Sequence, residues 1–126
     1  MTAPALPTTR LGQLREKVAA AMGDEIVVHA DVVEALEPPC YLLGWGAPWL
    51  DYMNGCSYVA RPAVICVAGR ISAAEGMANL ERLLEAATPR LALIGPIERV
   101  ETPSTLDVAN ITYLTARIIL RTTVNL

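Results

Sequence analysis

One stretch of the chain has the residue order of a phosphate-binding site. In VAGRISAAEG an apolar run reaches Gly69 and Arg70, and a helix is predicted to follow. Strand, glycine turn and helix is the order in which many nucleotide sites offer backbone amides to an anion. Such a turn usually needs several glycines, but the next one, Gly76, already lies in the predicted helix, and no GxGxxG or P-loop motif occurs. We therefore interpret the stretch as a core strand and the helix that packs across its sheet.

The other reactive side chains are too few and too scattered for a catalytic or metal site. The chain has one histidine, His29, and three cysteines, Cys40, Cys56 and Cys66, without a CxxC pair. Structural zinc takes four ligands, usually in closely spaced pairs. Serine or cysteine catalysis would depend on His29 as the base, and no GxSxG elbow occurs. We expect no enzyme activity, no cofactor and no metal, and we expect the thiols to be buried as small apolar side chains.

Between Lys17 and Arg61 the chain has six acidic residues and no lysine or arginine, whereas most of the arginines follow from Arg61 onwards; the net charge is −3. This division suits a molecule that meets its own copies head to tail, although ordinary solvated faces would have the same composition. An acidic loop likewise explains the carboxylates of residues 31–37 without any acid–base chemistry. The acidic residues of this stretch are Asp24, Glu25, Asp31, Glu34, Glu37 and Asp51, and the arginines that follow it are Arg61, Arg70, Arg82, Arg90, Arg99, Arg117 and Arg121.

Aromatic side chains gather in one short segment, LGWGAPWLDYMNG. Trp45, Trp49 and Tyr52 lie there between turn residues, which predicts a loop after a short strand, CYLLGW. Tryptophan and tyrosine offer large contact areas at low entropic cost and are enriched at interaction hot spots, although a tryptophan can equally cap a core. We expect one tryptophan to be buried and the other to be available to a partner.

The bulk composition favours a single domain over residues 1–126 that buries some of its surface in an assembly. Apolar residues make up 53% of the 126 residues, and the mean hydropathy of +0.38 is high for a small soluble monomer. The uncharged stretches are too short to span a membrane, and the start does not have the pattern of a secretory signal. We therefore expect a soluble, non-secreted protein that associates with itself, and a flexible tail over residues 1–7.

Apolar periodicity predicts two helices. The first, at about 9–22, begins after Thr8 or Thr9 and ends at Gly23, with an apolar stripe through Leu14 and Val18. The second, at about 72–88, begins with a capping box formed by Ser72 and Glu75. Pro89 is predicted to end this longer helix.

The remaining segments predict an antiparallel sheet. Strands are expected at about 25–33, at CYLLGW and at CSYVARPAVICVAGR, where Pro62 indicates an edge, a bulge or a strand start. A further strand is expected before a turn around Pro103 and Ser104, and a long strand after it alternates between an apolar face and a wetter face that carries Tyr113 and Arg117. The predicted class is α+β, with a mostly antiparallel sheet of four to five strands packed against the two helices.

This order of elements resembles the tail terminator proteins of long-tailed bacteriophages, also called tail-to-head joining proteins. The resemblance covers about Leu11 to Val124 and rests on several segments together. They are the N-terminal helix, PPCYLLGW, ARPAVICVAGR, AAEGMANLERLLEAA and VETPSTLDVANITYLTARIILRTT. The resemblance implies a structural virion protein that forms a ring, generally a hexamer, on the growing end of the tail tube. Such a ring ends polymerisation of the tube protein at the length set by the tape-measure protein, a further candidate partner, and joins the tail to the head stopper or connector.

The resemblance also implies a location in the virion tail or neck, and in the host cytoplasm during assembly, with DNA passing through the lumen without specific binding. It transfers no functional residue, so the interface candidates come from composition: Trp45, Trp49, Tyr52, Arg117 and Arg121. The acidic residues from Asp24 to Glu37 are expected to pair with a neighbour's arginines or to line the lumen. Two other functions remain open: another head-tail neck component, and a small-molecule-binding domain with a pocket beside the two tryptophans.

Overall fold

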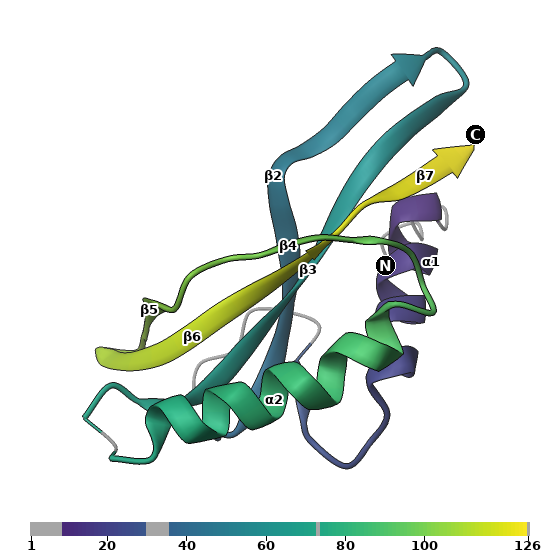
Figure 1. Ribbon diagram of the computed structural model, residues 1–126. Helices are drawn as coiled ribbons and strands as arrows, with labels where there is room; N and C mark the ends of the chain where they lie inside the picture. Colours follow the sequence, from purple (N-terminus) through teal and green to yellow (C-terminus); the bar gives the residue numbers. More distant parts are fainter. Residues whose placement is uncertain (1–8, 30–35, 73, 126) are drawn as a thin grey trace, which may run out of the picture.

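The computed structural model describes residues 9–29, 36–72 and 74–125. Within these ranges the chain forms two helices that pack on a twisted, mixed sheet of seven strands (Figure 1). The helices are α1 (Arg10–Met22) and α2 (Gly76–Leu91). The strands are β1 (Val28–His29), β2 (Cys40–Asn54), β3 (Ser57–Arg70), β4 (Ile97–Val100), β5 (Ser104–Val108), β6 (Ile111–Leu120) and β7 (Thr122–Asn125). The α+β class is therefore confirmed, with more strands than the four to five expected.

The sheet is organised around β3, which is hydrogen-bonded on both sides. The strand order is β1-β2-β3-β6-β4, and β5 also pairs with β6. One half of β3 pairs with β6, and the other half pairs with β7. All of these pairs are antiparallel except β1 with β2. Because β3 changes partner along its length, it belongs both to the body of the protein and to an extension of the sheet.

The two helices cover the same face of the sheet and enclose the main core with it. The core is formed by Leu14, Val18 and Met22 of α1, Leu80, Leu83, Ala87 and Leu91 of α2, and side chains of β2, β3, β6 and β7. The Tyr41 hydroxyl of β2 donates a 2.9 Å hydrogen bond to the Leu83 carbonyl of α2, and burial raises the pKa of this tyrosine to about 12. Neither helix has the length and hydropathy required of a membrane-spanning segment.

The first helix follows its sequence signals closely. The Thr9 hydroxyl accepts a 2.9 Å hydrogen bond from the Gly12 amide, as an N-cap should. Gly23 ends the helix with a φ of 75°, in the region that favours glycine. The Arg90 guanidinium donates to the Met22 carbonyl at this end, so α2 closes the last turn of α1.

The second helix is displaced from its predicted position by three to four residues. It begins at Gly76 after the N-cap Glu75, whose side chain makes no capping hydrogen bond, so the predicted capping box of Ser72 and Glu75 is wrong. It also continues through Pro89 to Leu91, although Pro89 was expected to end it. Pro89 has no amide hydrogen to donate within the helix, which disfavours the last turn. Leu91 is completely buried in the core, and this burial stabilises the turn.

Two strand predictions also change. The expected strand at 25–33 reduces to Val28–His29, while residues 30–33 lie outside the described residues. The expected wetter face of β6 is mostly covered, because Tyr113 packs with Leu36, Cys40 and Val67 in a second, smaller cluster. This second cluster lies on the face of the sheet that carries no helix. Its residues are buried as completely as those of the main core under the helices.

Strands β5 and β6 form a hairpin whose turn does not lie around Pro103 and Ser104, where the sequence predicted it. Pro103 ends a short connection between β4 and β5, and the tight turn lies at Ala109 and Asn110, between β5 and β6. Both residues have positive φ, 51° and 66°, which is the geometry of a type I′ hairpin turn. Asparagine tolerates this conformation, but alanine gives no signal for it, so the turn could not be recognised from its residues.

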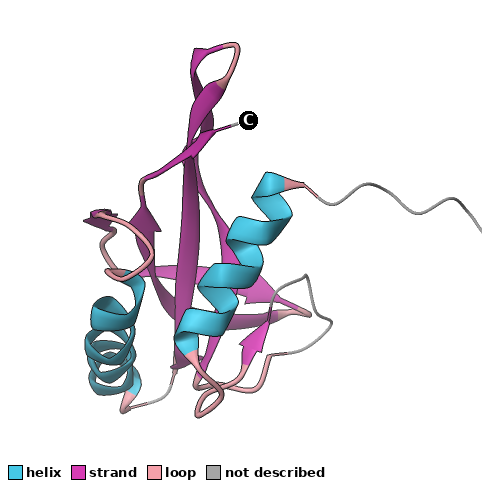
Figure 2. Ribbon diagram, turned by 90° about the vertical axis from the view of Figure 1, so that its right-hand side faces the viewer, coloured by secondary structure: helices cyan, strands magenta, loops and turns pink. Residues whose placement is uncertain are grey.

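The predicted loop GAPWLDYMNG is strand. It forms the distal half of β2, which pairs with β3 as far as Asn54 and Ser57. Residues 50–60 form a hairpin, here called the arm, that extends beyond both helices (Figures 1 and 2). The arm ends in a two-residue turn in which the Asn54 side chain accepts a 2.7 Å hydrogen bond from the Cys56 amide. Strand β7 pairs with its β3 side.

Candidate interaction surface

The arm joins the body at a bulge in β2. The pairing with β3 shifts between Trp45, opposite Pro62, and Leu50, opposite Ala60, so residues 46–49 lie opposite Arg61 alone. Of the three placements predicted for Pro62, an edge, a bulge or a strand start, the structure shows a bulge, which begins directly after its partner Trp45. Gly46 allows the bulge backbone to lie directly on β6, because a Cβ there would be 2.6 Å from Ile119 Cγ2. The bulge reorients β2, and it carries Trp49.

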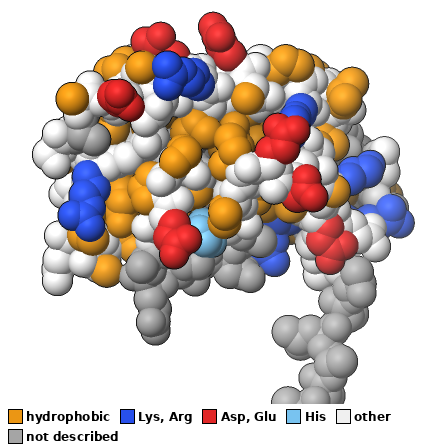
Figure 3. Space-filling view, turned by 90° about the horizontal axis from the view of Figure 1, so that it is seen from below, with side chains coloured by type: hydrophobic (Ala, Val, Ile, Leu, Met, Phe, Trp, Pro, Cys, Tyr) orange, Lys and Arg blue, Asp and Glu red, His pale blue; other side chains and the backbone are white. Residues whose placement is uncertain are grey.

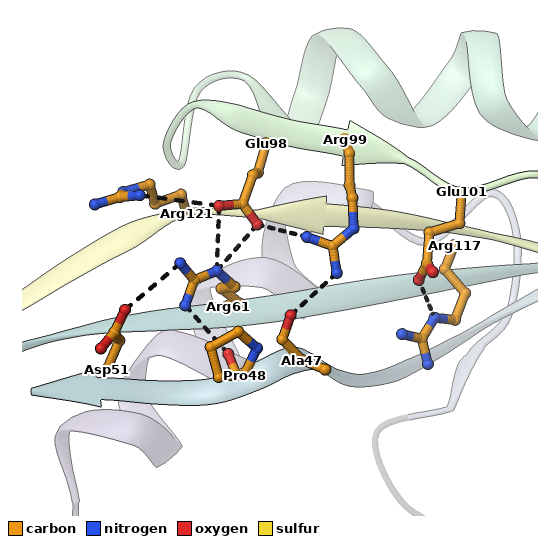
Figure 4. Close-up of polar contacts among 9 residues, drawn as sticks. All are labelled: Ala47, Pro48, Asp51, Arg61, Glu98, Arg99, Glu101, Arg117 and Arg121. Carbon is orange, nitrogen blue, oxygen red and sulfur yellow. Dashed lines mark hydrogen bonds and ion pairs between the residues drawn. The ribbon is translucent and has the colours of Figure 1, made fainter.

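A network of arginines holds this bulge on the helix-free face of the sheet (Figure 4). Arg61 donates through Nε to both carboxylate oxygens of Glu98, at 3.2 and 3.0 Å, and through Nη1 to the Pro48 carbonyl at 3.2 Å. Arg99 contacts the same carboxylate at 2.8 Å and donates to the Ala47 carbonyl at 3.2 Å. Two arginines on different strands therefore fix two successive bulge carbonyls.

Glu98 is the electrostatic centre of this network. Arg121 approaches its carboxylate as well, at 3.9 Å, and Asp51 of the arm lies 3.9 Å from Arg61. The Arg61 side chain is only 7% exposed and that of Glu98 is 23% exposed. A guanidinium this deeply buried requires a counter-ion and hydrogen-bond acceptors, and Glu98 with Pro48 provides them.

The aromatic side chains lie on the face of the sheet that carries α1. The rings of Trp45 and Trp49 are 5.5 Å apart, and those of Tyr52 and Tyr58 are 5.2 Å apart. Trp45 packs against the core, whereas Trp49 is 50% exposed and Tyr52 is 65% exposed. One tryptophan was expected to be buried, and Trp45 is partly buried; that Trp49 meets a partner stays a prediction. Met53, next to Tyr52, is exposed too, so the arm carries two large exposed apolar side chains.

The five interface candidates do not form one site. Trp45, Trp49 and Tyr52 lie together along β2, while Arg121 joins the Glu98 network on the other face. Arg117 lies farther along β6 and pairs with Glu101 at 2.8 Å. It lines a separate groove of about 410 Å³ together with apolar side chains such as Leu106 and hydroxyls such as Thr115. The structure therefore separates the aromatic surface from the arginine surface by the thickness of the sheet.

Some of the acidic residues between Lys17 and Arg61 form ion pairs with arginines of the same chain. Glu25 approaches Arg90 of α2 at 3.6 Å, and Asp51 approaches Arg61. Asp31 and Glu34 lie outside the described residues. Seen from below α2, acidic and basic side chains are interspersed around an apolar area, so this face does not present a single sign of charge (Figure 3).

The reactive side chains do not assemble in the described part of the chain. No group of three or more His, Cys, Asp or Glu residues within the described ranges could hold a metal ion. Cys40 and Cys66 are buried, and burial raises their pKa values to about 11 and about 12. The prediction of burial is wrong for Cys56, which is exposed because it lies in the turn of the arm, where no other layer covers it.

Alkylation should therefore distinguish the three thiols. At pH 8 we expect iodoacetamide to modify Cys56 in the native protein and to leave Cys40 and Cys66 unmodified, because their thiolate forms are scarce and enclosed. Intact mass should show a single adduct under native conditions and three after unfolding in urea. Rapid native modification of Cys66 would contradict the central position of β3 in the core.

The close approach at Gly46 can be tested against a neighbouring glycine. Gly46→Ala should lower the free energy of unfolding by about 1–3 kcal/mol, since the new methyl overpacks the buried Ile119. Gly44→Ala is the matched control, because its Cβ would lie an ordinary 3.5 Å from Ile65, and we expect a change within about 0.5 kcal/mol. Urea unfolding curves of both variants measure the difference, and equal losses would contradict the tight contact at the bulge.

Arg61, Glu98 and Arg99 were not among the residues selected from the sequence. One signal was present: Arg61 interrupts the apolar run YVARPAV, and a charge within a core strand implies a buried partner. The identity of that partner, on another strand, was not visible. No family model matches the chain, and no curated protein matches it.

Proposed function

We propose that the protein is a structural virion component that forms a ring on the end of a phage tail tube, ends its polymerisation and joins the tail to the head connector. The observation that carries this proposal is the arm. It extends beyond the helices. It presents Tyr52 and Met53 to the outside, and Trp49, in the bulge at its base, is exposed as well. A large apolar surface on a projecting hairpin is typical of a subunit that is completed by its neighbours.

The order of elements supports the same proposal. A short N-terminal helix, a central strand followed by a long helix, and a set of closing strands follow one another in the order on which the resemblance to tail terminators rests. In this proposal the partners are further copies of the chain, the tail tube protein and the head stopper or connector, and the ring is a hexamer. DNA passes through it without specific binding, and the protein has no enzymatic role.

A small-molecule-binding function is the second candidate, because one observation favours it. A groove of about 320 Å³ lies beside Trp45 and Trp49, where such a function would need a pocket. A thermal-shift screen with a ligand library separates the two candidates, since a ring subunit should not respond to it. Another neck component would also form a ring, but would not arrest tube growth.

The deciding experiment is negative-stain electron microscopy of the protein mixed with growing tubes of its tail-tube partner. We expect blunt tubes of arrested length, each with a ring of density at one end. Tubes that continue to grow without end density would overturn the terminator proposal and favour another neck role.

A further inference from the structure

The turn of the arm contains the one asparagine of the chain that is followed by a glycine. Asn54 and Gly55 are both exposed at the tip, where β2 passes into β3. A Cβ at Gly55 would have no atom of the described residues within 4 Å, so nothing outside the turn crowds the Gly55 amide. Because glycine has no side chain to shield its own nitrogen, that nitrogen can approach the side-chain carbonyl carbon of the preceding asparagine closely.

The hydrogen bonds of the turn orient and polarise the Asn54 side-chain carbonyl. Its Oδ1 accepts from the Cys56 amide at 2.7 Å and, more weakly, from the Ser57 hydroxyl at 3.4 Å. The ring that the first of these bonds closes includes the Gly55 nitrogen, so the bond folds the side chain back over the peptide group that would attack it. The oxygen becomes negative during such an attack, and two donors on it stabilise the developing charge as an oxyanion hole does.

We propose that Asn54 is a site of spontaneous deamidation that the fold accelerates. The Gly55 nitrogen forms a bond to Cγ of Asn54, and the Cγ–Nδ2 bond breaks. The amide proton of Gly55 passes through water to the departing nitrogen, which leaves as ammonia, and a cyclic succinimide remains. Water then opens this ring. Addition at Cγ yields aspartate, whereas addition at the main-chain carbonyl yields isoaspartate, and water is the only reactant besides the chain itself.

Either product changes the tip of the arm. Aspartate places a negative charge where the neutral amide was. Isoaspartate carries the same charge and also routes the main chain through the side-chain carbonyl, which inserts a methylene group into the backbone of the turn. Because turn length sets the register of a hairpin, the pairing of Asn54 with Ser57 would be lost. The arm would therefore exist in an original and an aged form, and this proposal does not rest on a role in a phage tail.

The chain offers an internal control and a matched variant. Asn110 is also exposed in a two-residue hairpin turn, between β5 and β6. The residue that follows it is Ile111, whose β-branched side chain crowds the amide that would have to attack. The matched variant is Gly55→Ala, which adds only a methyl group for which the folded arm has room. Circular dichroism establishes that this variant is folded like the original protein.

The test incubates the native protein, and the same protein unfolded in urea, at one mildly alkaline pH. Peptide mass mapping, with separation of the aspartate and isoaspartate forms, follows each asparagine with time. We expect Asn54 to react roughly ten-fold faster in the native protein than in the unfolded chain, below the ~100-fold that one donor of an enzyme's oxyanion hole can contribute. Gly55→Ala should slow the native reaction by at least about ten-fold. Asn110 should stay unmodified over the same period.

Two results would overturn the proposal. If Asn54 reacted no faster in the native protein than in urea, the hydrogen bonds of the turn would restrain the side chain instead of activating it. If Asn110 or the Gly55→Ala variant reacted as fast as the native Asn54–Gly55 pair, the reaction would not depend on the open glycine amide.

Discussion

Replacing Glu98 with alanine should lower the free energy of unfolding by about 3 kcal/mol, the low end of the range for breaking a buried ion pair. The substitution leaves Arg61, with a side chain only 7% exposed, without its closest carboxylate. Asp51 remains nearby, but at 3.9 Å and on a 63% exposed side chain it can compensate only in part. Arg99 and Arg121 would then repel Arg61 instead of sharing a counter-ion with it.

Glu101→Ala is the matched control, because Glu101 directly follows β4, the strand that contains Glu98, and also pairs with an arginine, at 2.8 Å. The side chains of Glu101 and Arg117 are each about one-third exposed. We therefore expect Glu101→Ala to lower the free energy of unfolding by about 1 kcal/mol or less. Urea unfolding of the two variants gives the comparison. A double-mutant cycle with Arg61→Met should show a coupling above about 1 kcal/mol. Equal effects of Glu98→Ala and Glu101→Ala would contradict the central role given to Glu98.

The second large effect concerns assembly. On the proposed function, Trp49→Ala combined with Tyr52→Ala should weaken binding to the tube end by about 30-fold to 1,000-fold, the range expected for aromatic hot spots. Both side chains are at least half exposed, so the fold should be retained with little loss of stability. The measurement is the concentration of protein needed to arrest half of the growing tubes.

Leu93→Ala is the matched control for this experiment. Leu93 is the most exposed of the large apolar side chains among the described residues, at 86%, and it lies outside the arm. We expect its loss to change the arrest concentration by no more than about two-fold. If the Leu93 variant failed to arrest growth and the Trp49/Tyr52 double variant capped tubes normally, these two aromatic residues would not be the docking surface.

The elements that were predicted correctly are those specified by residues close to one another in the sequence. Thr9, the stripe through Leu14 and Val18, and Gly23 specify α1 within 15 residues, and α1 is found where they place it. The apolar run of β3 likewise predicts a strand covered on both faces, and Val64 and Val67 are completely buried on opposite faces.

The arm was missed because its residues give conflicting local signals. Gly46 and Pro48 are turn formers, yet the bulge accommodates both and β2 continues beyond them. The real turn is at Gly55 and Cys56, after Asn54, at the end of the segment that was read as loop. Pairing with β3 decides this outcome, and pairing is a property of two strands rather than of one.

The candidate surface was predictable in composition but not in arrangement. The aromatic candidates are close in sequence, and the structure also brings the rings of Trp45 and Trp49 within 5.5 Å of each other. The Arg61–Glu98 pair joins residues 37 positions apart, which no spacing rule connects. The placement of Arg121 beside Glu98, and of Arg117 beside Glu101, depends on how β4 lies along β6.

The continuity of β3 gives the arm a mechanical property. A single strand of 14 residues runs from the turn of the arm into the centre of the body, bonded to β2 on one side and to β7 and then β6 on the other. A pull on the arm along β3 therefore loads these ladders in shear, so that many hydrogen bonds resist at once instead of opening one after another. A tensile load on the arm is transmitted to the core of the protein without a hinge in β3.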